Sequence, residues 1–193
     1  MLASINPLGE RVRRNRWGCT VAAFTVAAAT AGALVGAAAA GAGRAAGIGG
    51  RWPLVAFGVA AVAAGMTDLW APGFVPSSAR QVDERWLGWY RGWVYGAGFG
   101  AQLGAGVVTV ITSATVYAWL AAAALSGSTA AGAVIGASFG LARSLPFLAV
   151  AGVTVPRDLR ARLRRLTAWS GPGRVVAAGA SVAVGAVCLV ARP

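Results

Sequence analysis

Residues 92–142 read GWVYGAGFGAQLGAGVVTVITSATVYAWLAAAALSGSTAAGAVIGASFGLA and contain no charged side chain. A membrane-spanning helix needs about 20 apolar residues, so this run is long enough for two spans. It divides at Ser126-Gly127-Ser128, a composition that is typical of a turn. Only 11% of the whole chain is charged, against about 25% in an ordinary soluble domain. The run and the composition together predict a polytopic membrane protein.

Further apolar stretches lie on both sides of this run. We predict membrane helices over residues 17–43, 52–67, 93–125, 129–153 and 175–191, within one membrane domain of residues 1–193. The 52–67 stretch is short, and a re-entrant segment is the alternative there. Open-edged sheets cannot cross lipid, and these stretches lack the strict alternation of a membrane β-barrel. The predicted fold class is therefore all-α, a transmembrane helix bundle of about five spans.

The basic residues, all 17 of them arginines, predict how the bundle is oriented. Thirteen lie in the N-terminal segment and in the predicted basic loops 68–92 and 154–174. They are Arg11, Arg13, Arg14, Arg16, Arg80, Arg85, Arg91, Arg157, Arg160, Arg162, Arg164, Arg165 and Arg174. Only Arg44, Arg51 and Arg192 fall in the segments on the opposite side. Arginine-rich loops stay in the cytoplasm, so we expect a cytoplasmic N-terminus in a multi-pass protein of the cell membrane, namely a bacterial inner membrane.

The formal net charge of +12 raises the question of a nucleic-acid partner. Because the arginines stand at the ends of predicted spans, we exclude nucleic acid and expect the lipid bilayer as the partner. In the 154–174 loop, Leu159, Leu163 and Leu166 are spaced three and four residues apart among arginines. This pattern predicts a segment that lies on anionic lipid, and a docking site for a cytoplasmic partner is the alternative.

Small residues four positions apart indicate where helices touch, because lipid provides no hydrophobic force between helices. The longest series is Gly132, Gly136 and Gly140. Shorter series join Gly32 with Gly36, Gly100 with Gly104, and Ser181 with Gly185. We predict that these faces pack within one chain, and a homodimer through one of them is the alternative.

Arg143 interrupts the apolar 129–153 segment about ten residues from its predicted inner end. An arginine inside a span is costly and usually faces protein or a water-filled cavity. Its long stem would allow it to snorkel to the interface, and the alternative is a functional anion-binding or gating role. Pro146, three residues later, is expected to loosen the helix and to free a backbone carbonyl.

The 93–125 segment combines polar side chains with many glycines. Gln102, Thr109, Ser113 and Tyr117 follow helical spacing, so we predict one polar stripe that either joins helices or lines a solute path. The glycines of residues 96–106 should let this helix bend or unwind, as the discontinuous helices of transporters do. The candidate solute path consists of Gln102, Thr109, Ser113, Arg143 and Pro146.

The residue inventory excludes most catalytic and cofactor chemistry. The chain has no histidine and only two cysteines, Cys19 and Cys188, which share no motif. A zinc site, a haem-attachment motif and a CxxC pair are therefore excluded, and no metal or other cofactor is expected. The five carboxylates are Glu10, Asp68, Asp83, Glu84 and Asp158. We expect all of them outside the spans, where they offer little general acid–base chemistry, so the chain is not expected to be an enzyme.

Three stretches, taken in order, resemble the transmembrane domain of the CcdA/DsbD thiol-disulfide carriers of cytochrome c biogenesis, within the LysE-like group of transporters. They are residues 4–8 (SINPL), 99–106 (FGAQLGAG) and 138–147 (SFGLARSLPF). The resemblance implies six helices in two inverted three-helix repeats, each opening with a helix broken at a proline-containing motif that bears a cysteine. In this chain, Asn6 and Pro7 would belong to the first helix-break motif. Gly104 and Gly106 would belong to the second.

The chain departs from this family where the redox chemistry is carried out. Leu8 and a residue near Gly106 stand where the resemblance implies cysteines. Cys19 and Cys188 are expected at opposite ends of their helices and should not pair, whereas a thiol relay needs two exchanging sulfurs. We also expect the five spans to be helices two to six of the family fold, with the first helix missing through either a late start codon or a natural truncation.

These expectations lead to two functional hypotheses. The first is an integral membrane protein that transports a small solute or anion on a CcdA/DsbD-like scaffold without thiol redox activity. An arginine in the path favours an anion. The alternative is a non-transporting membrane subunit, bound to a partner subunit, that supports envelope thiol-redox chemistry or cytochrome c maturation.

Overall fold

The computed structural model describes residues 5–48, 52–71, 75–77, 85–106, 108 and 111–191. Within these ranges every regular element is helical, which confirms the predicted all-α fold class. The α-helices are α1 (Pro7–Val12), α2 (Trp17–Ala45), α3 (Trp52–Trp70), α4 (Trp86–Trp89), α5 (Gly92–Gly104), α6 (Thr115–Ala124), α7 (Thr129–Ala142) and α8 (Pro156–Val190). A 3-10 helix, η1 (Leu145–Val150), follows α7.

Four helical segments of the described chain are long and apolar enough to cross a membrane. They are α2, α3, α8 and residues 129–150, where η1 continues α7. α3 is one 19-residue helix that continues through Trp70, beyond the predicted end at residue 67. These lengths and compositions agree with the predicted multi-pass membrane protein.

The predicted span over residues 93–125 is interrupted in the structure. The segment forms two short helices, because α5 ends at Gly104 and α6 begins only at Thr115. Gly106 has a φ of +74°, and its N–H donates to the carbonyl of Leu103 at 3.1 Å. A residue in this left-handed region terminates an α-helix, and glycine adopts it without a Cβ clash. The glycine-rich composition thus produces a break rather than a bend.

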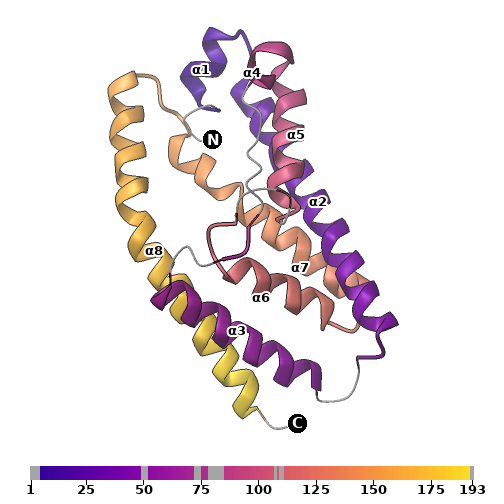
Figure 1. The fold of residues 1–193 in the computed structure, drawn as a ribbon. Helices are drawn as coiled ribbons and strands as arrows, with labels where there is room; N and C mark the ends of the chain where they lie inside the picture. Colours follow the sequence, from indigo (N-terminus) through magenta and orange to yellow (C-terminus); the bar gives the residue numbers. More distant parts are fainter. Residues whose placement is uncertain are drawn as a thin grey trace.

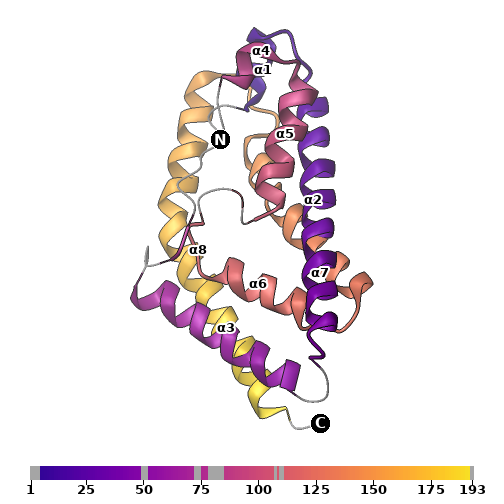
Figure 2. The same cartoon turned by 45° about the vertical axis from the view of Figure 1, so that its right-hand side comes forward.

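The helices form two groups joined by α6. α2 extends along most of the molecule, with α5 and α7 packed beside it (Figure 1). α3 packs against α8, and α6 lies between this pair and the α2–α7 pair (Figure 2). The N-terminal ends of α2, α5 and α8 lie at the same end of the molecule (Figure 1). Arginine-rich segments adjoin all three of these helix starts, so they gather at one end of the fold.

The contact between α2 and α7 is a backbone-to-backbone contact, here called the glycine seam: Gly32 and Gly36 of α2 against Gly132 and Gly136 of α7. A Cβ on Gly136 would lie 2.0 Å from the carbonyl oxygen of Gly32, and one on Gly36 would lie 2.1 Å from that of Gly132. Gly140 approaches α2 as closely, at the carbonyl of Ala28. Such contacts allow the close helix packing that stabilises membrane bundles.

The remaining small-residue faces are also covered within the chain. Gly100 and Gly104 of α5 face the α2 backbone, since a Cβ on either would lie 2.2 and 2.1 Å from the carbonyl oxygens of Phe24 and Ala28. On α8, the Ser181 hydroxyl donates to the carbonyl of Ala61 in α3 at 2.8 Å. These surfaces are therefore occupied without a second copy of the chain.

The predicted basic loop over 154–174 is helical from Pro156 onwards. It forms the first half of α8, which runs without interruption from Pro156 to Val190 over 35 residues, or about 52 Å. Pro156 stands at the start, where proline is favoured, and arginine, leucine and alanine are good helix formers. The helix is therefore longer than the roughly 30 Å hydrocarbon core of a bilayer.

Candidate functional site at a broken membrane helix

The break between α5 and α6 is the point where polar groups gather inside the bundle. Gly106 lies against two aromatic rings: a Cβ there would be 2.9 Å from Phe139 and 3.3 Å from Trp119. These rings stack on each other with centroids 4.2 Å apart and an interplanar angle of 18°. The absence of a side chain at Gly106 thus lets the broken backbone pass directly beside the stack.

The position of Asp68 in the structure differs most from the position that the sequence predicts. It was expected outside the spans, yet it lies inside α3 and is only 2% exposed. Its carboxylate accepts the Ser113 hydroxyl at 2.5 Å and the backbone N–H of Ala114 and Thr115 at 2.7 and 3.3 Å. These are the first N–H groups of α6, which have no partner within that helix. Asp68 therefore caps α6 from a neighbouring helix, and its negative charge meets the positive end of the α6 dipole.

The sequence does contain an indication that Asp68 lies inside a membrane helix. Leu69 and Trp70 continue the apolar stretch past the carboxylate, so a span ending at the first charged residue is too short. A single acid inside such a stretch indicates an internal hydrogen-bond partner. The identity of that partner was not readable, because Ser113 lies 45 residues away along the chain.

The described members of the predicted polar stripe, Gln102, Ser113 and Tyr117, do not lie on one continuous helix. Gln102 is half-buried on α5, Ser113 lies in the non-helical segment, and Thr109 is outside the described residues. Tyr117 lies on α6 and donates its hydroxyl to the carbonyl of Pro76. The break changes the direction of the chain between Gln102 and Ser113, so helical spacing no longer brings them to one face. Ser113 instead joins Asp68, and its hydroxyl lies 2.5 Å from that of Thr115.

Arg143 lies on the other side of the aromatic pair. It is the C-terminal cap of α7, and its guanidinium carbon is 5.3 Å from the centre of the Phe139 ring. Phe139 precedes it by one helical turn, so the side chain folds back along α7 towards the helix N-terminus. Its Nε is buried and has no hydrogen-bond partner. No carboxylate in the described part of the chain forms an ion pair with it.

Pro146 lies in η1, where the α-helical ladder of α7 has ended. The expected loosening of the helix appears as this switch from α to 3-10 geometry, which starts at Leu145. The Pro146 side chain is exposed. Of the five predicted path residues, Ser113 and Arg143 therefore lie beside the two sides of the break.

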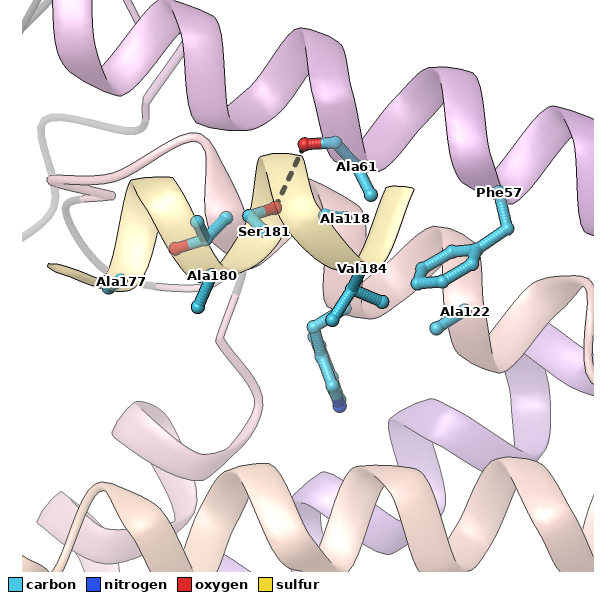
Figure 3. Close-up of a pocket in the computed structure, with 10 residues that line it drawn as sticks. Phe57, Ala61, Ala118, Ala122, Ala177, Ala180, Ser181 and Val184 are labelled. Carbon is cyan, nitrogen blue, oxygen red and sulfur yellow. Dashed lines mark hydrogen bonds between the residues drawn. The ribbon is translucent and has the colours of Figure 1, made fainter. Parts of the chain in front are cut away.

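A groove of about 300 Å³ lies next to the break, between α3, α6 and α8 (Figure 3). It is lined by Phe57, Ala61, Thr115, Ala118, Trp119, Ala122, Ala177, Ala180, Ser181 and Val184. Thr115 connects it to Asp68 through Ser113, and Trp119 connects it to Arg143 through Phe139. The groove and the break therefore share two residues of α6.

A second buried carboxylate lies at the arginine-rich end of the molecule. Glu10 is 0% exposed and accepts the Thr20 hydroxyl at 2.8 Å and the Tyr95 hydroxyl. Arg13 forms a 2.8 Å salt bridge with it. Gly92 leaves room for the Glu10 carboxylate, since a Cβ at Gly92 would lie 3.0 Å from one of the carboxylate oxygens. The cluster ties α1 to α2 and α5, and Glu10 itself lies in α1, which is not among the helices long enough to cross a membrane.

The predicted break motif at Asn6 and Pro7 starts a helix. Asn6 accepts the backbone N–H of Gly9 at 2.8 Å through its side-chain oxygen, and Pro7 is the first residue of α1. The two cysteines are free: Cys19 is exposed near the start of α2, and Cys188 lies near the end of α8. In the ranges that the structure describes, no group of three or more His, Cys, Asp or Glu side chains is placed to hold a metal ion.

Comparisons with protein-family models, with curated proteins and with solved structures find no match to this chain. The resemblance to the CcdA/DsbD carriers therefore stays a prediction.

Proposed function

We propose that this chain is an integral membrane protein that carries a small anion past the break between α5 and α6, with Arg143 as the anion-binding residue. The observation that supports this most directly is the environment of Arg143. Its cation lies inside an apolar helical segment, over Phe139, with a buried Nε that has no hydrogen-bond partner. A charge in such surroundings is strongly destabilised unless a counter-charge is present.

The other charge near the break does not serve as that counter-charge. The carboxylate of Asp68 accepts three hydrogen bonds, two of them from the N-terminal end of α6. Asp68 is therefore already used as the cap of α6, and its negative charge is offset by the positive end of the α6 dipole. Arg143 is therefore the cation that remains available to a solute, and this favours an anion over a cation.

The direction of the Arg143 side chain argues against snorkelling. With the N-terminus in the cytoplasm, as the arginine distribution predicts, α7 runs from the outer to the inner side. A snorkelling side chain would extend towards the inner interface. The guanidinium instead lies over Phe139, which precedes it and is on the outer side of it.

The broken helix supports transport over a purely structural role. Non-helical backbone is tolerated at membrane depth only where protein or a water-filled cavity surrounds it. Discontinuous helices of this kind commonly build the central sites of transporters, since their ends can move separately. The separation of Cys19 and Cys188 leaves this chain without a pair of exchanging sulfurs, so the proposal includes no redox step.

Anion flux in proteoliposomes tests this function. Chloride and nitrate efflux would be measured for wild type, Arg143→Ala and Arg143→Lys, with protein-free liposomes as the blank. We expect flux to fall about tenfold or more in Arg143→Ala and to be partly retained in Arg143→Lys, since one lost charge contact of about 1.4 kcal/mol corresponds to a factor of ten. Arg160→Ala, on the exposed surface of α8, is the matched control and should be unchanged. Equal flux in all four proteins would remove Arg143 from the mechanism.

The non-transporting subunit is the second candidate. It is favoured by the N-terminal half of α8, where no residue is buried before Ala178, so a basic surface is open to a partner. Purification in mild detergent discriminates the two: a stoichiometric partner supports the subunit role, and a chain that purifies alone and shows anion flux opposes it.

A further inference from the structure

The groove beside the break has an apolar lining with no free hydrogen-bonding group. Its three polar side chains are all used within the protein. Ser181 donates to the carbonyl of Ala61, Thr115 is bonded to Ser113, and Trp119 donates to the carbonyl of Ile135 at 3.0 Å. A polar solute in this groove would lose its water without gaining partners. The chemistry of the lining therefore fits a hydrocarbon occupant.

Arg174 is the arginine of α8 nearest to the groove along the chain, three residues before Ala177. α3 and α8 are antiparallel: a Cβ on Gly185 would lie 2.6 Å from the Gly58 carbonyl oxygen, and one on Gly65 would lie 2.6 Å from that of Ala178. Because Gly65 also lies beside Val182, Asp68 is level with about Ala177, and Arg174 lies one turn further towards the start of α8. The groove lining on α8 begins at Ala177 and extends towards the C-terminal end of the helix.

Arg174 also shares a helix face with the lining. Arg174, Ala177, Ser181 and Val184 are spaced three, four and three residues apart, which aligns them along one side of α8. Figure 3 shows the last three along the groove. The Arg174 side chain is exposed. One end of an apolar groove is therefore next to an exposed cation, as recognition of an acidic lipid requires.

We infer that this groove binds one acyl chain of an acidic phospholipid, with the lipid phosphate at Arg174. The apolar lining accepts the chain, and the guanidinium pairs with the phosphate in the geometry that arginine favours. The other exposed arginines of the same half of α8 raise the local positive potential, which selects an acidic headgroup over a zwitterionic one. This inference does not depend on anion transport.

Native mass spectrometry of the purified chain in mild detergent tests it, with phosphatidylglycerol and phosphatidylcholine of equal acyl length as probes. We expect one retained phosphatidylglycerol per chain, held about tenfold more tightly than phosphatidylcholine. Arg174→Gln should remove this preference and leave weak binding of both lipids. Arg157→Gln, at the start of the same helix, keeps the groove mouth intact and should retain the preference.

Filling the groove is the second arm of the test. Ala180→Phe places a ring among exposed lining residues and should abolish the retained lipid. Ala183→Phe adds the same ring to an exposed position of α8 outside the lining. Circular dichroism and thermal unfolding of both variants in detergent establish that they are folded. Equal retention of the two lipids by wild type, or retention of phosphatidylglycerol by folded Ala180→Phe, would overturn the inference.

Discussion

The glycine seam and the break between α5 and α6 are built from similar residues and have opposite properties. In the seam, glycines of α2 and α7 bring two backbones so close that a Cβ would overlap a carbonyl oxygen at 2.0 to 2.5 Å. At the break, Gly106 ends a helix and leaves polar groups, two stacked rings and a groove of about 300 Å³ nearby. The repeated glycines on intact helices thus form a close contact, whereas Gly106, with its positive φ, ends a helix beside the candidate site.

A side chain in the seam should have the largest effect on stability. Gly136→Ala adds a Cβ 2.0 Å from the Gly32 carbonyl oxygen, so α2 and α7 must move apart. We expect a loss of about 1–3 kcal/mol, the range for overpacking a tight contact. Thermal unfolding in detergent would measure it. Gly179→Ala on α8 is the matched control, because nothing lies within 4 Å of its Cβ. Equal stability of the two variants would show that the seam is not a close contact.

Removing the cap from α6 should have the next largest effect. Asp68→Ala leaves the N–H groups of Ala114 and Thr115 without their acceptor, which should cost about 2 kcal/mol. Asp68→Asn keeps one acceptor oxygen and should cost less. Hydrogen exchange by mass spectrometry should show faster exchange across α6. The exposed Asp158 provides the control, and Asp158→Ala should change stability by less than about 1 kcal/mol. Unchanged protection of α6 in Asp68→Ala would argue against the cap.

The smallest stability effect is expected in the Glu10 cluster. Tyr95→Phe removes the hydrogen bond that the hydroxyl donates to Glu10 and the 3.2 Å bond that it accepts from Asn15. Because Thr20 and Arg13 still contact the carboxylate, we expect a loss of about 1 kcal/mol. Tyr90→Phe is the control, because that side chain is 49% exposed. Thermal unfolding of both variants checks the prediction. A Tyr95→Phe protein as stable as Tyr90→Phe would mean that the hydroxyl adds nothing to the cluster.

The sequence was sufficient for features that depend on length and local spacing. A run of apolar residues long enough to span lipid predicts a helix, because no other structure satisfies the backbone there. Repeats such as Gly132 to Gly140 predict the contact face, because small residues alone permit close packing. The predicted location of the helix break near Gly104 and Gly106 rests on the same local reasoning.

Features that depend on distant partners were not readable. Asp68 was assigned to a loop because an isolated carboxylate is unfavourable in lipid. Its cost is offset by donors from Ser113, Ala114 and Thr115, and only the fold brings these to α3. The prediction of a polar stripe depended on a distant feature in the same way. It assumed helical spacing across residues 93–125, whereas the break separates Gln102 from Ser113.

Anion binding at Arg143 is the central claim, and the shift of the melting temperature with added anion tests it most directly. Wild type and Arg143→Ala would be titrated with sodium chloride and sodium nitrate in detergent. A ligand that binds only the folded chain raises its melting temperature with concentration, whereas general salt effects act on both proteins alike. We predict a saturable rise in wild type that is absent in Arg143→Ala. An equal rise in both proteins would contradict the claim.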